Sequence, residues 1–224
     1  MSLSPAIAST LLADCVTVTD GQVAVTRPEL LATERLDAVV WAAVFGDADE
    51  REYARWLLWE VGQAVGVRCA SIHDLYLARG RGECGGFTVP AINVRAASYD
   101  TARAIFRTAN RLDAGAFILE IARSEIAYTE QRPAEYVAVM IAAALREGFR
   151  GPLFIQGDHF QVNAKKYAAN PGPEVDAVKQ LVTEAVAAGF YNVDVDTSTL
   201  VDLSQPTLDA DVKAKLAAAY DAKF

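Results

Sequence analysis

The chain has 224 residues, of which 52% are hydrophobic, and a formal net charge of −8 at pH 7. This length accommodates one sizeable core or two small ones. An acidic chain without a basic stripe is a poor binder of nucleic acid or of membrane surfaces, and no apolar run approaches the roughly 20 residues of a transmembrane helix. Cys15, Cys69 and Cys84 fit neither a disulfide framework nor a CxxC zinc site. Since the N-terminus lacks the layout of a signal peptide, we expect a cytoplasmic protein.

Residues 1–86 are expected to form a helical N-terminal extension with a small β-hairpin. The segment 16–26 alternates polar and apolar residues around Asp20 and Gly21, which is a strong hairpin signal. Helical patterns follow at about 28–45, at about 49–65 and from Ser71 onward. The Gly-rich segment 78–86 is interpreted as a connector, because it lacks the spacing of a phosphate-binding loop.

From residue 87 onward, strands and helices alternate regularly. Strand-like segments, each apolar over most of its length, cover 87–94, 116–122, 152–159 and 191–198. Helical patterns cover 98–112, 133–147, 173–188 and 209–222. Gly115, Gly148 and Gly189 follow three of these helices, where a left-handed cap costs glycine least. Near-continuous apolar strands are typical of sheets buried on both faces. Four βα units in series therefore predict an α/β region, 87–224, with a parallel sheet and right-handed crossovers.

Polar side chains collect where the predicted strands end, and the strand starts are apolar. The residues concerned are Asn93 and Arg95; Glu120, Arg123, Ser124 and Glu125; Asp158, His159, Gln161, Asn163, Lys165 and Lys166; and Asp194, Asp196, Thr197, Ser198 and Asp202. In a βα series the loops at the C-terminal ends of the strands build the site. We therefore expect one pocket there, formed by Asn93, Glu120, Asp158, His159 and Asp196.

The pair Asp158-His159 has two interpretations from spacing alone. A neutral imidazole binds a divalent metal through one ring nitrogen, and the carboxylate beside it moves a proton near a substrate. The structural alternative is that His159 caps the strand end and Asp158 caps the next loop. Asp194 and Asp196 share one face of their strand by the period of two, either within the site or as a buried pair that needs partners. His73 is interpreted as a packing or surface residue.

Four motifs occur in order along the chain: VPAINV at 89–94, FILEIA at 117–122, GDH at 157–159 and DTSTLVDLSQPTLDADV at 196–212. Together they resemble class II fructose-bisphosphate aldolases and their relatives, the tagatose-bisphosphate aldolases and the barrel-shaped partner subunits of those enzymes. The resemblance covers about 87–212. That family is a (β/α)8 TIM barrel, so the resemblance implies that 87–224 contributes four of eight βα units. We expect the chain to be the N-terminal portion of a longer aldolase-like protein.

The resemblance also implies roles for the residues of the motifs. Asp158 matches the catalytic acid/base of the family, His159 matches a zinc ligand, and Asn93 matches the strand-one Asn at the substrate site. Glu120, Asp196 and Ser198, at the other strand ends, complete the candidate substrate-binding residues. Zinc, or another divalent metal, would polarise the carbonyl of a ketose substrate.

The chain departs from the family in its histidines. The further zinc ligands of the family are histidines from later strands, but no histidine follows His159, and Ala122 stands where the family has a small hydroxyl residue. Catalytic zinc usually has three protein ligands. We therefore expect a class II aldolase-like lyase, acting on a ketose (bis)phosphate but incomplete in this chain. The alternative is a non-catalytic sugar-phosphate-binding or partner-stabilising barrel subunit. A half-barrel with open edges predicts a homo-oligomer.

Overall fold

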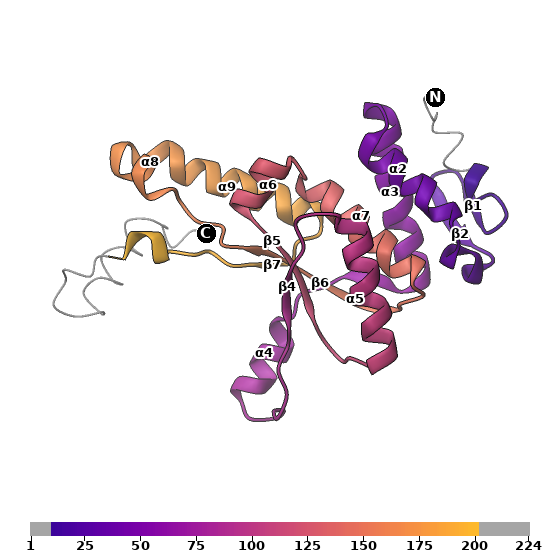
Figure 1. The fold of residues 1–224 in the computed structure, drawn as a ribbon, viewed down its shortest axis with the longest axis horizontal. Coiled ribbons are helices and arrows are strands. Elements are labelled where there is room, and N and C mark those ends of the chain that lie inside the picture. The colour runs from indigo at the N-terminus through magenta and orange to yellow at the C-terminus, as the bar shows by residue number, and fades with distance from the viewer. Residues whose placement is uncertain (1–9, 202–224) are drawn as a thin grey trace.

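The hairpin at the N-terminal side forms as predicted. The structure, a computed structural model, describes residues 10–201 (Figure 1). Strands β1 (Val16–Thr19) and β2 (Gln22–Val25) pair antiparallel. Asp20 and Gly21 between them have φ values of 50° and 74°. Two successive residues at positive φ give the turn that matches the twist of a hairpin.

The helices of the N-terminal part are η1 (Pro28–Ala32), α2 (Arg35–Phe45), α3 (Ala48–Val65) and α4 (His73–Gly80). The single helix expected over 28–45 is thus divided. Thr33 is extended there, and its hydroxyl donates to the carbonyl of Leu30 at 2.7 Å, a local bond that competes with continuation of the helix. Helix α3 begins with a capping box between Asp47 and Glu50.

The main sheet is parallel and has five strands: β3 (Val67–Cys69), β4 (Ala91–Asn93), β5 (Ile118–Ala122), β6 (Gly151–Asp158) and β7 (Asn192–Val193). The strands β4, β5, β6 and β7 are neighbours in chain order, which confirms the predicted α/β class with a parallel sheet. The strand β3 was not predicted; it pairs with the start of β6. The side chain of Asn192 on β7 bonds to β6 and to the residue that follows β3, because its amide nitrogen donates to the carbonyls of Ile155 and Ala70.

The remaining helices are α5 (Ser98–Leu112), α6 (Arg123–Thr129), α7 (Pro133–Arg146), α8 (Ala164–Ala169), α9 (Pro171–Ala188) and η2 (Ser198–Leu200). Helices α5, α7 and α9 match the predicted ones closely. The short helices α6 and α8 lie in the strand-end loops and were not predicted. The helix expected over 209–222 lies outside the described residues.

Helix α7 is the centre of the core. It packs against α2, α3, α5 and α9, and residues 136–145 are all buried. A helix that is apolar on all sides is expected where neighbours surround it. One core cluster extends from Leu12 to Leu200 and includes the fully buried Phe106, Tyr136 and Phe160. In Figure 1, α2, α3, α5 and α7 lie together on one side of the strands, and α4 lies apart from them.

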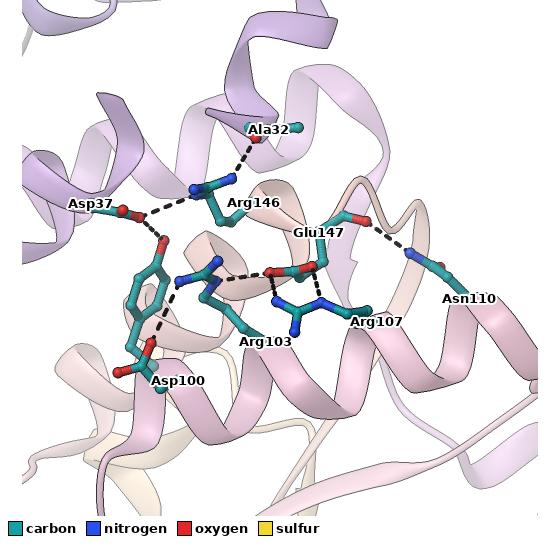
Figure 2. Close-up of polar contacts among 9 residues, drawn as sticks. Ala32, Asp37, Asp100, Arg103, Arg107, Asn110, Arg146 and Glu147 are labelled. Atoms are coloured by element: carbon teal, nitrogen blue, oxygen red, sulfur yellow. Dashed lines mark hydrogen bonds and ion pairs between the residues drawn. The ribbon is translucent and has the colours of Figure 1, made fainter. Parts of the chain in front are cut away.

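A polar network joins the N-terminal helices to α5 and α7 (Figure 2). Glu147, just after α7, accepts hydrogen bonds from Arg103 at 2.8 Å and from Arg107 at 2.9 Å. Asp37 on α2 accepts from Arg146 at 3.2 Å and from the hydroxyl of Tyr99 at 2.7 Å. The hydrogen bond from Arg107 is the main cause that lowers the pKa of Glu147. These contacts fix the position of the N-terminal part relative to the βα units.

The two faces of the main sheet differ in chemistry. Along β6, Leu153, Ile155 and Gly157 are buried on the face that packs into the core. Gln156 and Asp158 alternate with them and are only partly buried on the opposite face. The open face of the sheet therefore carries the polar side chains that end the strands.

Within residues 10–201, no helix combines the length and the apolar character needed to cross a membrane.

Candidate functional site

A row of polar side chains crosses the open face of the sheet. Asn93, Glu120 and Gln156 are direct neighbours in the register of β4, β5 and β6, so their side chains share one face. The amide of Gln156 donates to Oε2 of Glu120 at 2.9 Å. The amide of Asn93 donates to Oδ2 of Asp158 at 3.2 Å. Both carboxylates are thus held by neutral amide donors, Glu120 from the adjacent strand β6 and Asp158 from β4, which lies beyond β5.

The chain turns sharply directly after Asp158. His159 has a φ of 47°, in the left-handed region, so the strand ends there and the imidazole leaves the line of β6. Phe160 then folds back into the core and its ring packs over Gly157. A Cβ at Gly157 would lie 2.6 Å from the ring of Phe160, so this approach requires glycine. The turn thereby places the imidazole beside the carboxylate of Asp158.

Asp194, just beyond β7, is bonded to both sides of this turn. Its backbone N–H donates to the carbonyl of Gly157 at 2.8 Å, and its carbonyl accepts from the N–H of Phe160 at 2.9 Å. Its carboxylate accepts from the N–H of His159 at 3.3 Å. The side chain of Asp194 is therefore directed toward Asp158 and His159.

Asp158, His159 and Asp194 each offer one ligand atom, and these atoms all lie within 4.8 Å of one another. Nδ1 of His159 lies 3.6 Å from Oδ2 of Asp158, whose side chain is 17% exposed against 57% for the imidazole. Carboxylate oxygens and imidazole nitrogen are common ligands of divalent cations. This donor set fits a divalent metal, and the structure brings together three candidate ligand residues where the sequence analysis counted one.

Glu120 lies in the middle of the row and is partly buried. Burial raises the pKa of Glu120, and the negative charge of Asp158 raises it further, while the hydrogen bond from Gln156 lowers it. Behind the strand, the hydroxyl of Tyr136 donates to the backbone carbonyl of Glu120 at 2.9 Å. Asn93 Oδ1 is buried and has no hydrogen-bond partner among the residues that the structure describes. The row therefore contains a carboxyl whose pKa is raised by burial and a buried acceptor without a donor among the described residues.

No family model, curated protein or solved structure matches the chain. The chemistry of the site is therefore argued from its own residues.

The predicted residues are brought together only in part. Asn93, Asp158 and His159 are in contact, and Glu120 lies in the same row. Asp196 does not belong to the group of ligand atoms around His159. Its two carboxylate oxygens accept from the N–H and the hydroxyl of Ser198 at 2.7 and 3.0 Å, a local turn that begins η2.

Sequence reasoning left Asp194 out of the expected pocket, although it considered a place in the site for it, and missed Gln156 entirely. The period of two did place Asp194 on the same face as Asp196, and that signal was available. Gln156 becomes visible only when the register of β5 and β6 is known, because this register puts it opposite Glu120.

A small cavity of about 340 Å³ adjoins the site on the side of His159. Arg123, Ser124 and Lys166 line it together with Glu174. Arg123 donates to Oε1 of Glu174 at 2.6 Å, so its charge is partly balanced. The cavity places cationic and hydroxyl side chains within the loops that follow β5 and β6.

Proposed function

We propose that the chain carries a metal-binding acid/base site of a class II aldolase-like lyase, which cleaves or forms a carbon–carbon bond of a ketose (bis)phosphate. The observation that carries the proposal is the grouping of Asp158, His159 and Asp194 at the C-terminal edge of a parallel sheet, with Asn93 bonded to Asp158. Such a cleavage needs a general base and a metal that stabilises the developing negative charge. A carboxylate beside an imidazole that can bind a metal supplies both.

We also propose that 87–224 is half of an eight-stranded TIM barrel. The parallel strands β4 to β7 follow one another in chain order, with α5, α7 and α9 between them, as in the winding of a barrel. The polar residues collect at the C-terminal ends of the strands, where barrel enzymes carry their sites. Among residues 10–201, β4 pairs with β5 alone, which leaves its other edge open to further strands.

A divalent metal held by Asp158, His159 and Asp194 would polarise the carbonyl of the ketose and stabilise the negative charge that develops as the bond breaks. Asp158 accepts the proton of the hydroxyl next to the scissile bond, and that carbon becomes the aldehyde. The electron pair of the broken bond moves to the carbon beside the ketose carbonyl, which is then protonated. Asn93 orients the carboxylate of Asp158 for the first proton transfer. Arg123 and Lys166, which line the cavity beside His159, favour a phosphorylated substrate.

The test is cleavage of ketose phosphates by the chain in the presence of Mn²⁺ or Zn²⁺, with the released triose or aldehyde measured. We expect slow turnover, because the open sheet leaves the site exposed to water. Asp158→Asn should lower the rate by about 100-fold or more, the usual contribution of a general base. The matched control is Asp176→Asn on the exposed surface of α9. Absence of cleavage with every ketose phosphate, or a rate that Asp158→Asn leaves unchanged, would contradict the proposal.

The second candidate function is a non-catalytic barrel subunit that binds sugar phosphate or stabilises a partner. A groove of about 960 Å³ between α5 and the edge strand β4 favours it, because the lining is strongly apolar. Phe87 and Leu112 line this groove, and Leu112 is 68% exposed. Exposed apolar patches of this kind mark interaction surfaces.

We propose that a second copy of the chain covers the groove, and light scattering at low micromolar concentration tests this. Leu112→Glu should shift the assembly toward monomer, whereas Val186→Glu, which exposes a new charge on α9 instead, should not. A wild-type chain that scatters as a monomer at these concentrations argues against a homo-oligomer.

A further inference from the structure

We infer that a cavity beside α2 binds a neutral, flat heteroaromatic compound with hydrogen-bonding edges, the class to which nucleosides belong. The cavity has a volume of about 660 Å³, within the usual range of small-molecule sites. Residues of α2, of the loop after β4, of the start of α5, and of α7 with the loop before it line the cavity. None of the residues of the candidate functional site lines it, so the inference does not depend on the proposed function.

Two aromatic side chains of α2 line the cavity and are largely exposed. Trp41 and Phe45 are 61% and 66% exposed, and their ring centroids are 4.5 Å apart with the ring planes tilted by 43°. They are four residues apart, so they lie on the same face of the helix. Val40 of α2 and Val139 of α7 also line the cavity, and both are buried. A flat ring that enters the cavity can therefore stack on an exposed aromatic face beside buried apolar side chains.

The charged side chains that line the cavity are almost balanced. They are the carboxylates of Asp37, Asp100 and Glu135 and the guanidinium groups of Arg95 and Arg103. Four of these five form ion pairs of 2.7 to 3.2 Å with residues outside the lining: Asp37 with Arg146, Glu135 with Arg55, Arg95 with Glu125, and Arg103 with Glu147. Asp100 lies 3.5 Å from Arg103 in the first turn of α5, where the partial positive charge of the helix N-terminus also offsets its charge (Figure 2). Since no group of the lining offers an uncompensated charge, the cavity favours a neutral ligand.

The side chain of Gln131 lines the same cavity and has hydrogen-bonding capacity to spare. Its Oε1 accepts from the hydroxyl of Ser98 at 2.8 Å, and its amide nitrogen donates to Glu135 at 3.4 Å. A side-chain amide has two donor and two acceptor positions. Among the described residues, Gln131 uses one of each, so one donor and one acceptor position remain for a ligand. A donor next to an acceptor matches the edge of a nucleobase, where the same two groups are neighbours.

The three features together define the class of ligand. The exposed rings favour a second aromatic ring, because nucleobases stack on aromatic side chains. The balanced charges disfavour both a free phosphate and an amine. The amide of Gln131 favours a ring with polar edges over a hydrocarbon. A phenyl compound meets only the first condition, and a free sugar meets only the last two, whereas a nucleoside meets all three.

Equilibrium dialysis against adenosine, guanosine, cytidine and uridine tests the inference. We expect at least one of these nucleosides to bind saturably, with one molecule per chain. Trp41→Ala should weaken that binding by about 5- to 150-fold, the effect of removing an aromatic side chain from a stacked base, and Trp41→Phe should restore most of it. Tyr76→Ala removes an exposed ring from α4 outside the cavity and should leave binding unchanged. The inference is overturned if none of the four binds at millimolar concentration, or if Trp41→Ala has no larger effect than Tyr76→Ala.

Two matched compounds and a salt series test the class of ligand. The 5′-monophosphate of the nucleoside that binds adds only negative charge and should bind no more tightly than the nucleoside. Ribose lacks the base and should not compete with the nucleoside. Raising the ionic strength should change the affinity by less than about 2-fold, because salt screens only interactions between charges. Tighter binding of the monophosphate, competition by ribose or a steep salt dependence would each refute the assignment to a neutral heteroaromatic compound.

Discussion

Gly157 links the fold of β6 to the geometry of the site, and Gly157→Ala tests that link. A Cβ added there would lie 2.6, 2.7 and 2.9 Å from three atoms of the Phe160 ring. Ordinary contacts between carbon atoms are about 3.5–4.0 Å, so the ring or the strand must move by about 1 Å. Phe160 is fully buried and cannot move outward without opening the core. The substitution therefore strains the turn that carries Asp158 and His159.

The expected cost follows from this overlap. Overpacking of a well-packed core costs about 1–3 kcal/mol of unfolding free energy. For a chain of this size, each kcal/mol lowers the melting temperature by about 2–4 °C, so we expect a decrease of about 2–12 °C. Differential scanning calorimetry measures it. Because the ligands from β6 shift with the turn, Mn²⁺ affinity should also fall.

Two comparisons separate the clash from a general effect of replacing glycine. Gly115→Ala introduces a Cβ that meets nothing within 4 Å and should leave the melting temperature within about 1–2 °C of the wild type, since such surface changes are small. Phe160→Leu removes part of the ring, so in the double variant the two costs should be less than additive. Strict additivity, or a Gly157→Ala chain as stable as the wild type, would refute the reasoning.

Three further substitutions probe the surroundings of the site. Glu147→Ala removes the largely buried carboxylate that accepts from Arg103 and should lower the unfolding free energy by about 1.5–3 kcal/mol. Loss of the partly exposed Glu184 should cost at most about 1 kcal/mol, and chemical denaturation measures both. Tyr136→Phe removes the hydrogen bond to the strand and should cost about 0.5–1.5 kcal/mol in the same assay. Glu120 has a pKa raised by burial, so the folded state loses stability as pH rises above the ordinary value of 4.5. Glu120→Gln should therefore be more stable than the wild type at pH 7, and the gain should vanish below pH 4.

The parallel sheet was predictable because its signals are local. Apolar runs bounded by glycine and separated by helical patterns specify βα units, and β4 to β7 follow them in order. The strand β3 was not predictable in this way, since three residues are too few to show a period. It exists because Val67–Cys69 completes the edge of β6, a contact between segments more than 80 residues apart.

The candidate site was predictable only where it follows from the order of the strands. Parallel strands end at one edge of a sheet, so the meeting of Asn93 and Asp158 follows from topology alone. The choice between Asp194 and Asp196 does not follow, because both lie on the same face by period. It depends on where the chain leaves the strand: Asp194 still bonds to the β6 turn, whereas Asp196 already folds back onto Ser198.

The site and the edge of the sheet depend on the same few bonds. The strand β7 has two residues, and its attachment to β6 continues through Asp194, which pairs with Gly157 and Phe160. This pairing brings the carboxylates of Asp194 and Asp158 close together, and like charges at such distances repel. The sheet bonds and the burial of Phe160 must offset that repulsion. A bound cation would replace the repulsion with attraction, so β7 is the part of the sheet whose pairing gains most from occupation of the proposed site.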